Sequence, residues 1–101
     1  MQYRQGDVWI ENVDEIPAGA KPVRSKNGRL VLAAGEATGH AHSLSARSGR
    51  LREVAGTIYL LLLRRALLEH EEHGKIELPP GKYLVRRQRE YHPEEIRRVQ
   101  D

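Results

Sequence analysis

The chain has 101 residues, the length of one domain, and its 39% apolar and 31% charged content is typical of a globular rather than a disordered protein. It has no cysteine, which excludes disulfides, thiolate metal sites and a cysteine nucleophile. The longest apolar run, residues 58–63, is too short to span a membrane, no secretory signal pattern opens the chain, and a net charge of +3 is weak evidence for nucleic-acid binding. We therefore expect a single domain, residues 1–101, that is cytoplasmic and has no membrane partner.

The first third of the chain predicts two strands separated by a loop. Residues 6–13 begin with a turn glycine and continue as a strand. Residues 14–23 contain two prolines and a glycine, which predicts a loop. Asn27-Gly28 is a strong turn signal, and residues 29–36 after it predict the second strand.

Residues 38–46 follow as a further alternating segment. Alternation places His40, His42 and Leu44 on one face of this strand. Because Leu44 favours an inward direction for that face, two of the five histidines are expected side by side against the interior.

The middle of the chain predicts a hairpin. Residues 47–56 predict a hairpin tip, a short strand and a turn, and residues 57–63 predict another strand. That last strand is apolar on both faces, so one face is expected in the core and the other against a partner subunit or the C-terminal tail. A helix over residues 59–72 is the alternative, because the segment is rich in helix formers; the strand-like start and the missing cap count against it.

Two alternating segments flank Pro79-Pro80-Gly81, which predicts a type II turn. Residues 92–101 begin with a proline and acids and end with basic residues, an order that predicts a short helix. The elements together predict an all-β fold, a small β-barrel or β-sandwich with a short C-terminal helix, and we expect it to form a homo-oligomer.

The histidines occur in two pairs that could share one metal ion. Neutral imidazole is a ligand for zinc, iron or nickel, and a catalytic metal needs about three protein ligands. His40 and His42 would supply two, and His70 or His73 a third if strand pairing brings them close. The metal ligands predicted are therefore His40, His42, His70 and His73.

Acidic residues accompany both pairs. Glu36, Glu69, Glu71 and Glu72 are candidates for a carboxylate ligand, a ligand-orienting group or a general base, and we take Glu72 and Glu36 as the candidate catalytic bases. Two alternatives stay open: unrelated surface histidines, or a metal-free pocket that uses histidine as a hydrogen-bond donor or acid/base.

The segment of residues 83–91 places arginines between two tyrosines on one strand face. Arg87 and Arg89 share a face with Tyr83 and Tyr91, a surface that suits an anionic ligand or RNA. A solvated strand face or an inter-subunit surface is the alternative that we favour.

Parts of the chain resemble the cupins, a family of small β-barrels. Gly35, His40 and His42 resemble the glycine and His-x-His of the first cupin motif, and Pro79 and Gly81 resemble its later Pro-x-Gly turn. The glutamate of that motif and the histidine after the turn are missing, so the resemblance implies a metal site only if His70 or His73 completes it. The whole chain also resembles small uncharacterised bacterial or phage proteins with similar segments, a likeness that implies no activity.

Two functions from different classes follow. The first is a His-lined β-protein that binds a divalent metal (zinc, iron or nickel) and activates water or a small oxygen-bearing substrate. The second is a non-enzymatic, oligomeric accessory or assembly module that binds protein or nucleic acid through its apolar and arginine-rich strands. Whether the protein is an enzyme is left open by the sequence.

Overall fold

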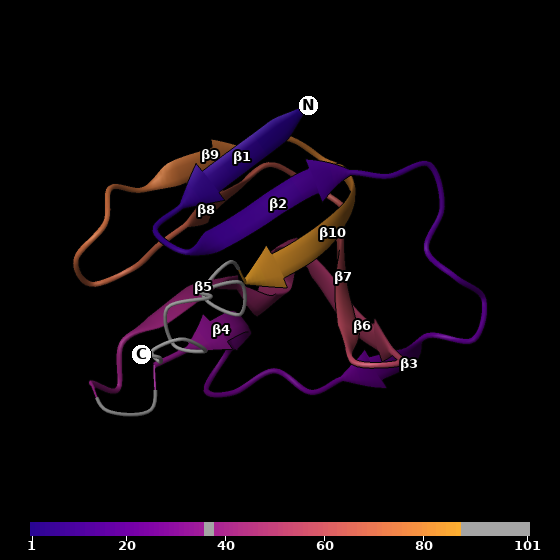
Figure 1. The fold of residues 1–101 in the computed structure, drawn as a ribbon, viewed down its shortest axis with the longest axis horizontal. Helices are drawn as coiled ribbons and strands as arrows, with labels where there is room; N and C mark the ends of the chain where they lie inside the picture. Colours follow the sequence, from indigo (N-terminus) through magenta and orange to yellow (C-terminus); the bar gives the residue numbers. More distant parts are fainter. Residues whose placement is uncertain (36–37, 88–101) are drawn as a thin grey trace, which may run out of the picture.

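A computed structural model describes residues 1–35 and 38–87, which form β-strands and one short 3-10 turn, without an α-helix in those ranges (Figure 1). The elements are β1 (Gln2–Gln5), β2 (Val8–Asn12), β3 (Lys21–Val23), β4 (Arg29–Ala34), β5 (Ala41–Ser45), η1 (Ala46–Ser48), β6 (Gly49–Val54), β7 (Thr57–Leu62), β8 (Ala66–Leu68), β9 (Ile76–Leu78) and β10 (Gly81–Arg87).

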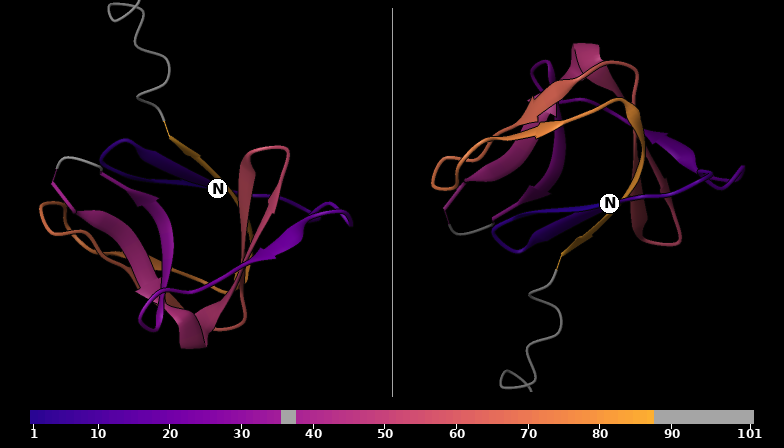
Figure 2. Two further views of the ribbon diagram at one scale, coloured as in Figure 1. Left: turned by 90° about the horizontal axis from the view of Figure 1, so that it is seen from below. Right: turned by 90° about the horizontal axis from the view of Figure 1, so that it is seen from above.

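The strands form one large sheet and two small ones. The large sheet is antiparallel with the order β1-β2-β10-β7-β6-β3, and the small sheets are the pairs β4-β5 and β8-β9. In both views of Figure 2, β4-β5 and the β6-β7 hairpin lie on opposite sides of the molecule. The fold is therefore all-β as expected, but the described sheets do not close into a barrel, because β1 and β3 end the large sheet as separate edges.

Short turns with left-handed residues fix the hairpins. Asn27 and Gly28 have positive φ values of 51° and 77°, the pattern of the predicted Asn-Gly turn. Ala55 and Gly56 repeat it between β6 and β7, with φ values of 52° and 80°. Gly6, with φ of 59°, starts a two-residue turn between β1 and β2, so residues 6–13 contain this turn and β2 rather than one continuous strand.

All three sheets contribute to one core. Its fully buried side chains include Ile10 of β2, Leu44 of β5, Leu60 of β7 and Tyr83 of β10. Successive side chains of a strand point to opposite faces, so apolar residues at every second position all reach the core. This burial is the physical reason why segments with alternating apolar residues form strands here. Leu60 and Leu62 are buried, whereas Tyr59 and Leu61 are only partly covered, so the expected inward face of β7 is confirmed.

The alternative helix over residues 59–72 is wrong. These residues form β7, a turn and β8, because β7 pairs along its whole length with β6 and β10, and tertiary pairing outweighs weak helix propensity. The two segments around Pro79-Pro80-Gly81 do not pair with each other: β9 pairs with β8, and β10 pairs with β2 and β7. The predicted helix at residues 92–101 lies outside the described residues. Within the described ranges, no helix has the length and apolar character needed to cross a membrane.

Candidate metal and histidine site

Strand β5 carries the first histidine pair to the interior. His42 is buried, with 4% of its surface exposed, and it points inward with Leu44 as the alternation predicted. His40 directly precedes the strand and is partly buried. The pair therefore spans the boundary between the core and the surface.

The loop between β8 and β9 brings the second pair to the same place. The backbones of Ser43 and Glu69 exchange two hydrogen bonds, of 3.0 and 2.8 Å, which dock the start of this loop on β5. The His70 ring centroid then lies 4.2 Å from that of His42 and 5.7 Å from that of His40. The His73 ring lies 4.7 Å from that of His70. The four predicted histidines therefore form one cluster.

A buried glutamine fixes the orientation of His42. The Gln5 Nε2 group donates to the backbone oxygens of Leu68 and Gly74, at 2.9 Å each. Its Oε1 atom therefore faces His42 Nδ1, at 2.8 Å, so that nitrogen carries a proton and donates it. Gln5 also joins β1 to both ends of the loop between β8 and β9, which stabilises the position of the histidines in that loop.

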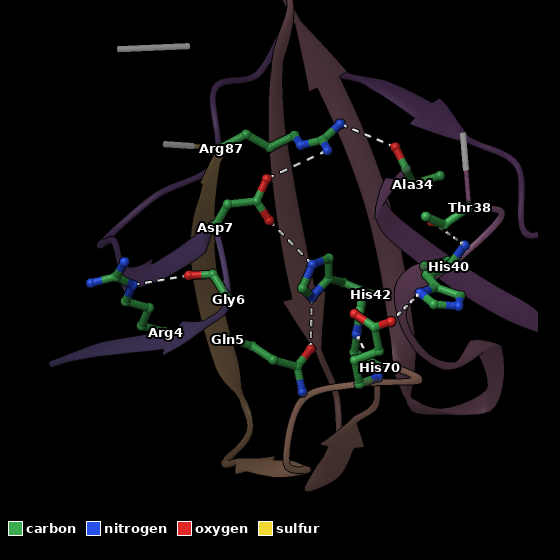
Figure 3. Close-up of polar contacts among 12 residues, drawn as sticks. Arg4, Gln5, Gly6, Asp7, Ala34, Thr38, His40, His42, His70 and Arg87 are labelled. Atoms are coloured by element: carbon green, nitrogen blue, oxygen red, sulfur yellow. Dashed lines mark hydrogen bonds and ion pairs between the residues drawn. The ribbon is translucent and has the colours of Figure 1, made fainter. Parts of the chain in front are cut away.

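Figure 3 shows a polar chain that continues from His42 to the end of β10. His42 Nε2 lies 3.3 Å from Asp7 Oδ1, and Asp7 Oδ2 lies 3.5 Å from the Arg87 guanidinium. Arg87 also donates to the Ala34 oxygen at 3.2 Å, which ties β10 to β4. Both nitrogens of His42 thus face protein groups, Nδ1 facing Gln5 and Nε2 facing Asp7.

Electrostatics favour a neutral His42 beside an ionised Asp7. Burial, followed by the neighbouring His70, holds the pKa of His42 below its ordinary value despite the opposing effect of Asp7. Burial alone would raise the pKa of Asp7, but Arg87, a backbone hydrogen bond and His42 outweigh it and lower that pKa. The Nε2–Oδ1 contact becomes a hydrogen bond only when Nε2 carries a proton.

Three other side chains present ligand atoms to a common point. His40, His70 and Glu71 each offer one such atom, and these atoms lie within 4.8 Å of one another. One carboxylate oxygen of Glu71 accepts the Ala41 N–H at 2.9 Å, which holds this carboxylate against the start of β5. The same hydrogen bond is the main cause that lowers the pKa of Glu71, and it favours the carboxylate form.

Glu72 and His73, the two other predicted site residues of this loop, lie beside the three ligand candidates. Glu72 Oε2 lies 3.5 Å from His40 Nδ1, and the Glu72 backbone N–H donates to His70 Nδ1 at 3.0 Å. His73 packs against Gly6, where even a β-carbon would collide with its ring. An open depression of about 530 Å³ adjoins the cluster, and its lining includes Ser43, His70, Glu71 and Lys75.

The four predicted histidines and Glu72 lie together, and Arg87 reaches them only through Asp7. Arg87 turns inward to Asp7 rather than outward to a ligand, and its buried Nε has no hydrogen-bond partner among the described residues. Glu36 and Arg89 lie outside the described residues. Sequence reasoning missed Gln5 and Asp7, which flank Gly6 in the β1-β2 hairpin; a turn glycine between two polar residues is a local signal for that hairpin.

Comparison with known proteins identifies one family. A family model described as a domain of unknown function (DUF8820) matches residues 4–88, which include every described residue of the site. No curated protein and no solved structure matches the chain significantly. A family of unknown function is therefore found, as the sequence led us to expect, but neither its bacterial or phage origin nor the cupin resemblance gains support.

Proposed function

The chain belongs to this family of unknown function, and we propose that it holds one divalent transition-metal ion between His40, His70 and Glu71 and uses it to activate water. The observation that carries the proposal is the approach of these three ligand atoms to within 4.8 Å of one another. Two imidazoles and one carboxylate are a common ligand set for zinc and iron, and three protein ligands leave a coordination position for water.

The ligands need only a small movement to close on an ion. Zinc ligands about 2.0–2.1 Å from the metal stand roughly 3.3–3.5 Å apart, so these atoms would approach one another by at most about 1.5 Å. His40 precedes β5, and His70 and Glu71 follow β8, so all three lie outside regular strands. Such positions can adjust without breaking a sheet.

The hydrogen bonds of the ligands specify what must change on binding. His70 Nδ1 accepts the Glu72 N–H, so in the neutral ring its Nε2 carries the proton. To bind a metal, His70 must either offer Nδ1 itself or move its proton to Nδ1 and offer Nε2. Either choice breaks the Glu72 hydrogen bond, so binding is coupled to a rearrangement of the loop.

Glu72 is better placed to orient a ligand than to act as a base on the metal-bound water. Its carboxylate faces His40 Nδ1 at 3.5 Å and favours a proton there, which leaves His40 Nε2 free for the metal. Behind the ligands, His42 packs its ring against that of His70 and is itself held by Gln5. A small oxygen-bearing substrate would enter from the adjoining 530 Å³ depression.

The test is metal binding by untagged, full-length protein. We expect one zinc or cobalt ion per chain by elemental analysis after dialysis, and a cobalt absorption spectrum of a four- or five-coordinate site. His70→Ala and Glu71→Gln should each weaken binding at least tenfold. His73→Asn is the matched control, because His73 is in the same loop but outside the ligand set, and should bind like the wild type. Absence of stoichiometric metal, or equal loss in the control, would overturn the proposal.

The oligomeric alternative also stays a prediction, and two exposed side chains favour it. Leu63, directly after β7, and Leu67, in the middle of β8, are 60% and 48% exposed. If they form a subunit contact, Leu63→Asp/Leu67→Asp should lower the molar mass in solution, as measured by light scattering, without loss of folding. An unchanged mass would exclude this contact.

A further inference from the structure

A second depression lies at the β3 edge of the large sheet, beside β3 and β6. Its volume is about 360 Å³, and its lining includes Ser25, Ala46, Arg50 and Arg52. The Ala46 N–H donates to the Gly28 oxygen at 2.9 Å, which holds the 3-10 turn η1 against the turn before β4. The depression is therefore bounded by three segments: β3 with the residues after it, η1, and β6.

Positive charge is concentrated on these segments. Residues 21–52 contain seven Lys/Arg and one Asp/Glu, a net charge of +6, whereas the whole chain carries +3. Six of these seven residues lie on the segments around the depression, and we call them the basic rim: Lys21, Arg24, Lys26, Arg47, Arg50 and Arg52.

Carboxylates within residues 1–35 and 38–87 do not neutralise the basic rim. Among the described residues, none of its six members forms an ion pair, whereas Arg29, the seventh cation, is paired with Glu69 at 2.6 Å. Five of the six are exposed, and Arg52 is partly buried. Glu53 is opposite Lys21 in the pairing of β3 with β6, without an ion pair between their side chains among the described contacts. The rim therefore presents cations that are free to meet an anion.

The geometry of the rim fits a chain of phosphates. Arg50 and Arg52 are alternate residues of β6, so they leave the same face about 7 Å apart. Four of the six cations are arginines, whose planar guanidinium matches phosphate oxygens in a bidentate manner. The lining of the depression contains no aromatic residue, so base stacking would contribute nothing there.

From this charge complementarity we propose that the basic rim binds the phosphate backbone of a nucleic acid without sequence preference. The inference is independent of the metal site, because none of the six residues belongs to the histidine cluster. It also moves the nucleic-acid surface away from Arg87, which faces Asp7.

The experiment measures fluorescence anisotropy of labelled 20-nucleotide RNA and DNA strands, and of a 20-base-pair DNA duplex, with full-length protein and EDTA present. We expect binding to at least one of them at 50 mM NaCl, with log K falling against log salt at a slope of about −3 for four contacts on a single strand. Arg50→Ala/Arg52→Ala should weaken binding at least tenfold and reduce the slope by about 1.4.

The matched control is Arg4→Ala/Arg86→Ala, which removes two arginines from the far half of the same sheet, on β1 and β10. It should change the affinity less than twofold. Equal weakening by both double variants would overturn the proposal, as would absence of binding to all three nucleic acids. Equally tight binding of poly-glutamate of the same length would also overturn it, because the rim would then select charge rather than phosphate.

Discussion

His42 Nδ1 donates its proton to Gln5 Oε1 over 2.8 Å, and both residues are buried. Two backbone oxygens fix the Gln5 amide, so this contact sets the tautomer of the histidine that lies beneath the candidate metal site. A residue of the first strand thus determines the state of a residue in the fifth.

Gln5→Ala should destabilise the fold by about 2–4 kcal/mol, because it leaves the His42 N–H and two carbonyl oxygens without partners in the interior. Gln2→Ala is the control: Gln2 is on the same strand but exposed, and its replacement should cost less than about 0.5 kcal/mol. Urea unfolding of both variants measures the difference. A similar cost for the two would contradict the assigned role of Gln5.

Acid should destabilise the protein in two windows. Because the folded pKa of His42 lies below 6.5, the unfolded chain binds a proton that the folded chain does not, and stability falls as the pH drops below about 6.5. The pKa of Asp7 in the folded protein is lowered from 3.8. The stability that ionised Asp7 contributes is therefore lost at lower pH, as the pH falls below about 3.8 and through the pKa of the folded state. Urea unfolding between pH 3 and 8 should show both losses.

Imidazole NMR identifies the group behind the first window. The His42 ring should stay neutral to a lower pH than 6.5, with its proton on Nδ1. This measurement does not depend on a variant that folds. A His42 ring that is protonated above pH 6.5 would contradict the predicted direction.

Gly49→Ala should severely destabilise the protein, by about 3 kcal/mol or more, because the added β-carbon would overlap the backbone oxygen of Leu61. Leu61 is in β7, which pairs with β6, so the backbone cannot move away without breaking the sheet. Gly19→Ala is the matched control, since no atom lies within 4 Å of its β-carbon position. Thermal unfolding should separate the two variants by more than 10 °C; equal midpoints would be inconsistent with the close approach of β6 and β7.

Tyr83→Phe should cost about 1–2 kcal/mol, since the buried Tyr83 hydroxyl donates to the Pro79 oxygen at 2.5 Å. This bond fixes the connection that carries the chain from the β8-β9 sheet into the large sheet. Tyr59→Phe, on the partly covered face of β7, should change stability by less than about 0.5 kcal/mol. Denaturant unfolding compares them, and a larger effect at Tyr59 would reverse this assignment.

Zinc should change the environment of one backbone amide more than its neighbours. Metal binding by His70 breaks the Glu72 N–H hydrogen bond to Nδ1, so the Glu72 amide should shift and exchange faster with solvent. The Ser43 amide, bonded to the Glu69 oxygen, should keep its protection. Amide NMR with and without zinc distinguishes the two, and an unaffected Glu72 amide in the metal-bound protein would rule out His70 as a ligand.

Local patterns predicted much of the framework. The Asn27-Gly28 turn, the strand that follows it, and the inward direction of His42 with Leu44 all depend on interactions within a few residues. Residues 59–72 were ambiguous because leucine is accepted in both helices and strands, and only the pairing of β7 with its two neighbours decides between them.

The sequence by itself therefore determined that the chain is built of strands and that His42 faces inward, because side-chain alternation is a local property. The tertiary structure alone decided which residues meet. The Ser43–Glu69 backbone pairing brings His70 and Glu71 to His40, the β1-β2 hairpin supplies Gln5 and Asp7 to His42, and Arg87 turns to Asp7. These contacts join residues 26 or more positions apart. The pairing that creates them depends on how whole sheets pack over a shared core, which no short stretch of sequence specifies.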